Sequence, residues 1–167
     1  MAHTFHGNHT RDWDLAMDHV SKKWPSIMEP LFEIGMNSMA VVVDLRASTE
    51  GLALNETDVI AGMLQSHLRS DLADCELRLA YAKEQRFYAN ITFSSYRDLH
   101  LTGQGGSITS SSISDHGFAI KIDVNTKLAS LSNLAELQRF GPKDFDALLS
   151  LCHEVFRARI PEILGGD

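Results

Sequence analysis

The feature that most constrains the fold is a series of segments between residues 77 and 124 in which apolar and polar side chains alternate. Alternation with a period of two is typical of strands that have one face on a core and the other in water. Turn-forming residues separate the segments at 83–85, at 102–106 and at His116-Gly117. Strands joined by short turns pair with their neighbours in antiparallel fashion. The sequence therefore predicts four or five successive antiparallel strands.

Helical patterns lie on both sides of these strands. Apolar residues recur every three or four positions over 13–24, which predicts an amphipathic helix, and Pro25 is expected to end it and to begin a second, short helix over 27–34. Near the C-terminus, helices are predicted over 128–140 and 142–161, because each segment carries an apolar stripe at helical spacing.

The order of these elements predicts the fold class. Helix, strand, helix, a run of strands and then helices are typical of an α+β protein. We expect a single domain over 11–167, with a curved antiparallel sheet of about five to six strands, helices on one face and a long C-terminal helix. Residues 1–10 are expected to form a flexible, histidine-containing tail.

An apolar run over 39–43 precedes the alternating segments and predicts a strand buried on both faces. Asp44 is expected at its end, with Arg46, Ser48 and Thr49 close behind. Carboxylates and hydroxyls at the end of a buried strand often serve a binding or catalytic site. A helix is predicted next, with Asn55 as its N-cap and apolar residues on one face up to Leu72.

The residues VDLRAST at 43–49, followed by VIAGML at 59–64, resemble the first metal-binding motif of class III nucleotide cyclases. The resemblance covers 41–65. It implies that Asp44 would bind Mg²⁺ or Mn²⁺ and that Ser48 and Thr49 would lie near the phosphates of a nucleotide, since such enzymes use metal ions to stabilise phosphoryl transfer.

Other parts of the chain depart from that family's pattern. The predicted hairpin at 83–85 lacks the Gly-Asp pair that would supply a second metal ligand, and Ala47 stands where glycine is usual. Asn125 is followed by Ala129 where an arginine would be expected. An active enzyme, a degenerate relative of the cyclases and an unrelated binding protein all remain open at this point.

The polar faces of the predicted strands supply a second set of candidate residues. Arg86, Tyr88 and Arg97 are basic or aromatic and, together with Arg46, Ser48 and Thr49, are our candidate ligand-binding residues. A patch of this kind suits an anionic ligand or an acidic partner. The alternative is a solvated face of ordinary cross-strand pairs. Further polar residues expected on these surfaces are Arg78, Asn90, Thr92, Tyr96 and Lys121.

Three further features each have an alternative interpretation. His67 on the apolar face of its helix is expected to be a core or interface histidine, or else a general base. The sequence GQGGS at 103–107 is typical of a hairpin turn, although glycine-rich loops can also bind phosphate. His3, His6 and His9 can bind Zn²⁺ or Ni²⁺ if the tail folds around the ion.

Charge and cysteine content narrow the partners. The chain has 15 basic and 22 acidic residues, a net charge of −7, and this argues against a nucleic-acid polymer or an anionic membrane as partner. No apolar run is long enough to cross a membrane, and no signal peptide is recognisable, so we expect a cytoplasmic protein. Cys75 and Cys152 fit no metal spacing and are expected to be buried thiols.

Two functions are therefore compatible with the sequence. The first, which we favour, is a non-enzymatic binding module that engages a partner protein or a small, anionic or nucleotide ligand, as a homo-oligomer. The second is a small metal-dependent nucleotide-processing or phosphotransfer enzyme that uses Asp44, with Mg²⁺ or Mn²⁺ as its cofactor.

Overall fold

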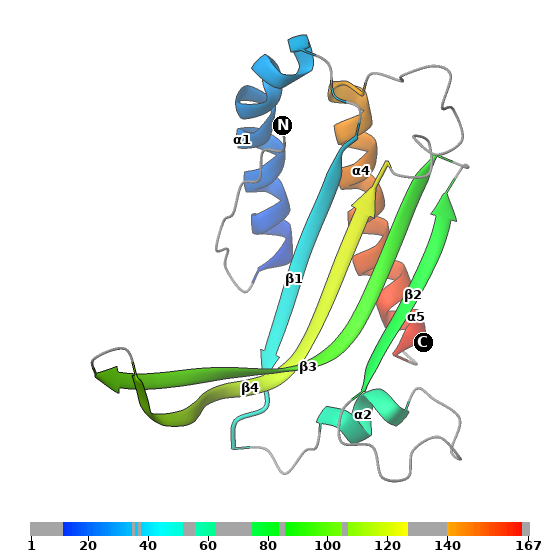
Figure 1. Cartoon of the computed structure of the whole chain (residues 1–167). Coiled ribbons are helices and arrows are strands. Elements are labelled where there is room, and N and C mark those ends of the chain that lie inside the picture. Colours follow the sequence, from blue (N-terminus) through cyan, green and yellow to red (C-terminus); the bar gives the residue numbers. More distant parts are fainter. Residues whose placement is uncertain are drawn as a thin grey trace.

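The computed structural model describes residues 12–34, 36, 38–51, 56–62, 75–83, 86–104, 107–126 and 140–164. These residues form an α+β structure in which helices pack on an antiparallel sheet, as predicted (Figure 1). Its elements in chain order are α1 (Trp13–Ile34), β1 (Ala40–Ser48), α2 (Glu56–Gly62), β2 (Glu76–Lys83), β3 (Phe87–Gln104), β4 (Ser107–Asn125), α4 (Pro142–Glu154), the π-helical turn η2 (Val155–Arg159) and α5 (Ile160–Ile163).

The sheet has the strand order β1-β4-β3-β2, and every neighbouring pair is antiparallel. β1 pairs with β4 from Ala40, which lies opposite Asn125, to Ser48, which lies opposite Gly117. β2 pairs with β3 throughout its length, with Glu76 opposite Ser94. The two longest strands, β3 and β4, are therefore the centre of the sheet.

The described part of the chain contains four strands rather than the five or six that we predicted. Residues 87–104 are one continuous strand, β3, and the segments on the two sides of the predicted turn at His116-Gly117 are one strand, β4. The predicted turn at His116-Gly117 is wrong, because His116 pairs with Arg97 and Gly117 with Tyr96 inside the sheet.

Gly117 is a strand residue for a steric reason. A Cβ atom at this position would lie 2.0 Å from the carbonyl oxygen of Ala47 on the neighbouring strand. Only glycine lets the backbones of β1 and β4 approach this closely, since any other side chain begins with that Cβ atom.

The prediction that the first strand is buried on both faces is also wrong. Alternate residues of β1 are exposed, and Val42 in the middle of the apolar run is 51% exposed. Helices cover only one face of the described sheet. Only alternate residues of the apolar run, such as Val41 and Val43, therefore face the helices and pack against the core. Asp44 is not at the strand's end either, because β1 continues to Ser48.

The core lies between the sheet and the helices α1 and α4 (Figure 1). Ile91 and Ile122 of the two central strands and Leu148 of α4 are completely buried. The α1 helix joins this core through aromatic contacts with the C-terminal helices. Trp24 stacks on Phe145 with ring centroids 6.0 Å apart, and Trp13 stacks on Phe156 with centroids 3.9 Å apart.

The predicted break at Pro25 does not occur, since α1 is continuous through both Pro25 and Pro30. A proline inside a helix costs about 3 kcal/mol relative to alanine. Both prolines lie on the exposed side of α1, while Trp24 and Met28 of the same turns pack inward. Burial of the apolar stripe therefore outweighs the helix propensity of these two residues.

The long C-terminal helix is present as α4, η2 and α5, which follow one another without interruption from Pro142 to Ile163. Pro161 lies just after the π-helical turn and does not end the helical run. In a regular α-helix the ring of Pro161 would clash with the carbonyl of Arg157, four residues earlier. The wider η2 turn contains Arg157 and relieves this clash.

Several predictions fall outside the described residues. They are the tail with His3, His6 and His9, the N-cap Asn55, the helical residues 63–72 with His67, and residues 128–139 of the helix expected over 128–140. Its last residue, Phe140, is described and is not helical, because it forms an antiparallel bridge with Met36. The described α2, Glu56–Gly62, lies where the first part of the predicted helix was expected. None of the helices in the described ranges is long and apolar enough to span a membrane.

Candidate functional site

β3 and β4 extend beyond the other two strands as a two-stranded arm, which we define as residues 98–104 and 107–115. Within the described residues, β1 ends opposite Gly117 and β2 begins opposite Ser94, so neither strand pairs with the arm. Figure 1 shows the arm bending away from the four-stranded part and extending past the end of β1. The turn predicted at 103–107 is consistent with the pairing of Gln104 with Ser107 at its tip.

One face of the arm is apolar and exposed. Leu99 lies opposite Ile113, and Leu101 and Ile108 lie on the same face. Their exposed fractions are 60% for Leu99, 52% for Leu101, 67% for Ile108 and 54% for Ile113. By strand alternation, this face continues the side of β3 that carries the core residues Ile91 and Phe93. We call these four residues the apolar stripe.

Two irregularities in pairing create the stripe. β4 has an extra residue at Ser114, beside the Asp98–Leu99 step, and another at Thr109, beside the Thr102–Gly103 step. A shift of one residue moves a side chain to the other face of a strand. The bulge at Thr109 therefore brings Ile108 to the face that carries Ile113.

The opposite face of the arm is polar. Thr102 and Ser110 lie across from each other, and their hydroxyl groups are hydrogen-bonded. His100 lies opposite Ser112 on the same face, and both are exposed. The arm is therefore amphipathic. Its apolar face remains more than half exposed, whereas the apolar residues of the core are buried.

At its base the arm is fixed to β1 by a cluster of polar side chains. The Arg46 guanidinium lies 3.3 Å from both carboxylate oxygens of Asp98 and 5.0 Å from the centre of the Tyr96 ring. Asp115 accepts hydrogen bonds from the Ser48 hydroxyl at 2.6 Å and the Tyr96 hydroxyl at 2.8 Å. We call these five residues the base cluster.

The contacts of the base cluster shift the pKa values of two of its members. The hydrogen bonds from Ser48 and Tyr96 lower the pKa of Asp115, because they stabilise its ionised form. The pKa of Tyr96 is raised, first by burial of the phenol and then by its hydrogen bond to the Asp115 carboxylate. Both shifts favour the pairing of an ionised Asp115 with a neutral Tyr96.

A second cluster connects the sheet to α2. It lies on the opposite face of β4 from Asp115 of the base cluster. Nδ1 of His116 lies 2.7 Å from Oε1 of Glu56, and the Thr49 hydroxyl donates a hydrogen bond to the same Glu56 oxygen. The backbone amide of Thr49 donates to the His116 carbonyl at 3.0 Å. Hydrogen bonds from Thr49, then from His116, lower the pKa of Glu56 to about 2.

Thr49, His116 and Glu56 do not have the geometry of a nucleophilic triad. Such a triad uses the two opposite nitrogens of the imidazole, one for the hydroxyl and one for the acid. Here the Thr49 hydroxyl lies 3.1 Å from Nδ1 of His116, the nitrogen that also contacts Glu56. Thr49 is only 3% exposed. The cluster is therefore suited to holding α2 against the sheet.

The structure brings only part of the predicted ligand set together. Arg46 and Ser48 are neighbours in the base cluster. Thr49, the next residue in the chain, is buried and does not belong to that cluster. Arg97 pairs with His116 and, by alternation, lies on the face of β3 opposite to Tyr96.

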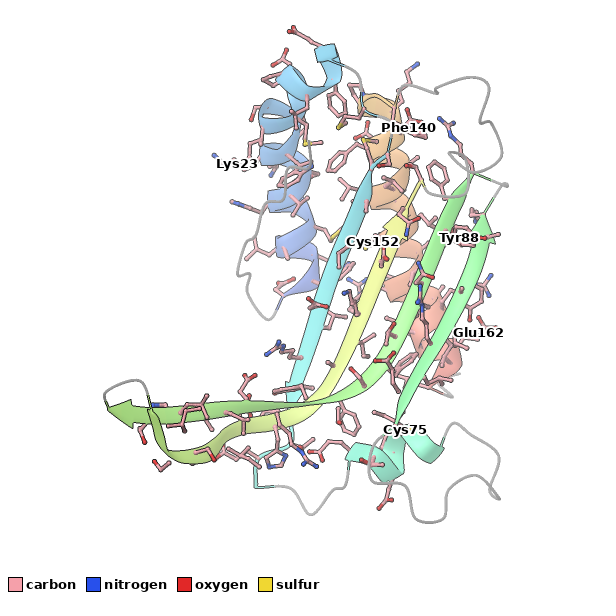
Figure 2. The ribbon with its side chains drawn as sticks, in the orientation of Figure 1. Lys23, Cys75, Tyr88, Phe140, Cys152 and Glu162 are labelled. Atoms are coloured by element: carbon pink, nitrogen blue, oxygen red, sulfur yellow. The ribbon has the colours of Figure 1, made fainter. Side chains whose placement is uncertain are left out.

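The other two predicted ligand residues lie toward the far end of the sheet. Arg86 forms an ion pair with Asp144 in the first turn of α4. Tyr88 pairs with Asn125, six positions along β4 from the partner of Arg46, or roughly 20 Å at the rise of a strand. Figure 2 shows Tyr88 near the end of the sheet that lies away from the arm. The six residues therefore form no single site.

The sheet face away from the helices carries mixed charge rather than a basic patch. By register, Arg46, Arg78 and Lys121 share it with Asp44, Glu76, Asp98, Asp115 and Asp123. Asp44 is exposed and lies opposite Lys121, and its diagonal neighbour Asp123 accepts a hydrogen bond from the Asn125 amide. In the part of the chain that the structure describes, no three His, Cys, Asp or Glu side chains are grouped as a metal site would require.

The two cysteines differ in their surroundings. Cys152 is completely buried in α4 between the helices and the sheet (Figure 2), and burial raises its pKa to about 12. Cys75, predicted to be buried as well, is only partly buried at the start of β2. Neither forms a disulfide bond. The thiol of Cys152 is therefore protonated and unreactive at neutral pH.

Sequence reasoning missed the apolar stripe as a candidate site, although a signal was present. The segment 99–114 contains no Lys, Arg, Asp or Glu, and apolar residues recur in both of its strands.

In comparisons with known proteins, the chain matches no protein-family model, no curated protein and no solved structure at a significant level.

Proposed function

We propose that the protein is a binding module that engages a partner protein through the apolar stripe of the β3–β4 arm. The observation that carries this proposal is the exposure of Leu99, Leu101, Ile108 and Ile113 on a single face, each above half of its maximum. Exposed apolar residues scattered singly are normal on soluble proteins, whereas a contiguous group marks an interaction surface.

The size of the stripe indicates what kind of binding to expect. Covering side chains that are slightly more than half exposed contributes about 1 kcal/mol each, or about 4 kcal/mol for the four residues. The partner's own apolar surface adds a similar amount. Association costs roughly 4–15 kcal/mol in lost freedom of motion. These four side chains alone therefore support only weak, reversible binding, with a dissociation constant of about 1 mM at best, and a tighter complex requires contacts beyond the stripe.

The base cluster and the Glu56–His116 contact support the same proposal. They hold the arm in one orientation through side chains from β1, β3, β4 and α2. A binding surface held rigidly before the partner arrives loses less conformational entropy on binding than a mobile one.

The enzyme alternative finds less support in the geometry. A two-metal site needs a second carboxylate within about 5 Å of Asp44, since its ions lie roughly 3.5–4 Å apart. The residue directly opposite Asp44 is the cation Lys121, and among the described residues no three His, Cys, Asp or Glu side chains are grouped as a metal site would require. We therefore keep the binding module as the proposed function.

Photo-crosslinking tests the proposal. Benzoylphenylalanine is placed at Leu101 in the stripe or at Leu15 of α1, because these two leucines are equally exposed, at 52% and 53%. Each purified protein is irradiated in an extract of its source cells, and the adducts are identified by mass spectrometry. We expect a defined protein adduct from position 101 that is absent from position 15. No adduct from 101, or the same adducts from both positions, would contradict the proposal.

A further inference from the structure

We infer that the outer edge of β1 binds an extended segment of another protein, which adds to the sheet as a further strand. This surface is separate from the apolar stripe and goes beyond the proposed function. β1 is the last strand on its side of the described sheet and pairs there with β4 alone (Figure 1). The backbone groups at this edge, the regularity of the strand and the side chains beside it carry the inference.

The backbone hydrogen bonds show which groups of β1 point to the edge. The Thr126 amide donates to the Met39 carbonyl at 2.9 Å, and the Thr49 amide donates to the His116 carbonyl at 3.0 Å. Both pairs continue the register of β1 with β4, in which hydrogen-bonded and non-hydrogen-bonded pairs alternate. The odd-numbered residues of β1 therefore bond to β4. The amides and carbonyls of the even-numbered residues between Ala40 and Ser48 point outward.

The outward groups form a regular row. In the described part of the chain no backbone group bonds to them. Such a row is a template for another strand, and proteins commonly block it with bulges, prolines or lysines. β1 pairs with β4 over nine residues without a shift in register, and it contains no proline or lysine. By contrast, the arm contains two register shifts, and the other edge strand, β2, carries Arg78 and Lys83.

The side chains of the even-numbered residues lie on the face of the sheet away from the helices. Val42 is 51% exposed. Asp44 is exposed, and no described residue forms a hydrogen bond or ion pair with its carboxylate. Arg46 extends away from the edge to Asp98 and Tyr96 of β3. The edge therefore presents an apolar side chain and, two residues later, an unpaired carboxylate.

These features specify the chemistry of the partner. Pairing with the outward backbone groups requires an extended polypeptide, and an antiparallel direction matches every other pair in the sheet. Such a segment places a basic residue opposite Asp44 and, two positions later in its own sequence, an apolar residue opposite Val42. The net charge of −7 favours a basic partner over a second copy of this chain. The expected pattern is basic-x-apolar.

A random peptide library displayed on phage supplies the probe. We expect the peptides selected on the purified protein to share the basic-x-apolar pattern. Val42→Pro removes one outward amide, and proline is accepted on an edge strand where its nitrogen faces away from the ladder. It should bind the selected synthetic peptide at least about tenfold more weakly than Val42→Ala, the matched control that retains the amide.

Hydrogen exchange followed by NMR locates the peptide on the wild-type protein. In the free protein, the amides of Val42 and Asp44 should exchange freely, whereas those of Val41 and Val43 should be protected by their bonds to β4. Saturating peptide should slow exchange at Val42 and Asp44 at least about tenfold.

A charge swap tests the side-chain contact at Asp44. Asp44→Lys should weaken peptide binding about fivefold, because an exposed ion pair contributes up to about 1 kcal/mol. A peptide with glutamate in place of its basic residue should bind this variant better than wild type. Circular dichroism and melting temperature establish that the variants are folded. If Val42→Pro is not, hydrogen exchange in the wild-type protein and the charge swap decide the question.

Three results would overturn the inference. The first is that no peptide is enriched on the wild-type protein. The second is a peptide that binds, at the apolar stripe for example, and leaves the amides of Val42 and Asp44 unprotected. The third is protection of these two amides in the free protein, because another segment of this chain or a second copy would then already cover the edge. None of these results bears on crosslinking from position 101, so the proposed function stands or falls separately.

Discussion

Nδ1 of His116 lies 2.7 Å from Oε1 of Glu56, and this contact joins the β4 strand at the base of the arm to the first turn of α2. Glu56 also accepts a hydrogen bond from the buried Thr49 hydroxyl. The end of β1, the first turn of α2 and the distant strand β4 therefore meet at one carboxylate. The stability of this junction should depend on the ionisation of Glu56.

The first prediction concerns pH and Glu56. Because its pKa is lowered from 4.5 to about 2 in the folded protein, the ionised carboxylate contributes stability above pH 4.5 that is lost as the pH falls toward 2. Glu56→Gln should lower the free energy of unfolding by about 1–3 kcal/mol near neutral pH and by much less near pH 2. Denaturant unfolding at a series of pH values measures this difference.

Glu50→Gln is the matched control, since Glu50 is an exposed carboxylate in the same connection between β1 and α2. It should change the free energy of unfolding by less than about 0.5 kcal/mol. A loss from Glu56→Gln that is the same at every pH would show that the ionised carboxylate is not the stabilising group.

The second prediction concerns Tyr96. Burial and the hydrogen bond to Asp115 raise its pKa, so its phenol should ionise at a higher pH than that of an ordinary tyrosine. Asp115→Asn removes the negative charge beside the phenol and should lower the pKa of Tyr96, without restoring it fully because burial remains. An alkaline titration followed by ultraviolet absorbance measures the change, with Asp123→Asn as the control. Identical titrations of wild type and Asp115→Asn would contradict the contact.

The third prediction concerns Gly117. Gly117→Ala places a Cβ atom 2.0 Å from the Ala47 carbonyl oxygen, so β1 and β4 must separate locally. We expect a loss of about 1–3 kcal/mol or more in the free energy of unfolding, as for other overpacked sites. Gly62→Ala in α2 meets nothing within 4 Å and should be neutral or stabilising. If Gly117→Ala proved as stable as wild type, close approach would not be the reason for this glycine.

Much of the fold follows from local patterns in the sequence, and the errors have tertiary causes. The alternation over 77–124 correctly predicted antiparallel strands. His116 and Gly117 are typical of a turn, but contacts with Glu56 and Ala47 require them inside β4. Neither partner is near them in the sequence.

The site could be predicted only in part for a similar reason. Arg46 and Ser48 were expected near one another and are, but their partners Asp98 and Asp115 come from β3 and β4, which only the pairing of distant strands brings to the end of β1. The alternation of Leu99 and Leu101 is visible in the sequence. Their exposure follows from where β1 and β2 end, which only the pairing of distant strands reveals.

The last prediction separates the binding module from the enzyme alternative at Asp44. Asp44 is exposed in the middle of β1, opposite Lys121, and we expect that no nucleotide raises the melting temperature, with or without Mg²⁺ or Mn²⁺. A ligand at one hundred times its dissociation constant would add about 2.7 kcal/mol, a shift of roughly 5–11 °C for a chain of this size. Such a shift would therefore be seen readily in a thermal scan. Asp44→Ala should melt within about 4 °C of wild type, because an exposed charge contributes about 0–1 kcal/mol. If instead a nucleotide stabilises wild type only with a divalent metal, and Asp44→Ala abolishes that effect, Asp44 is a metal ligand and phosphotransfer replaces protein binding as the better account of the chain.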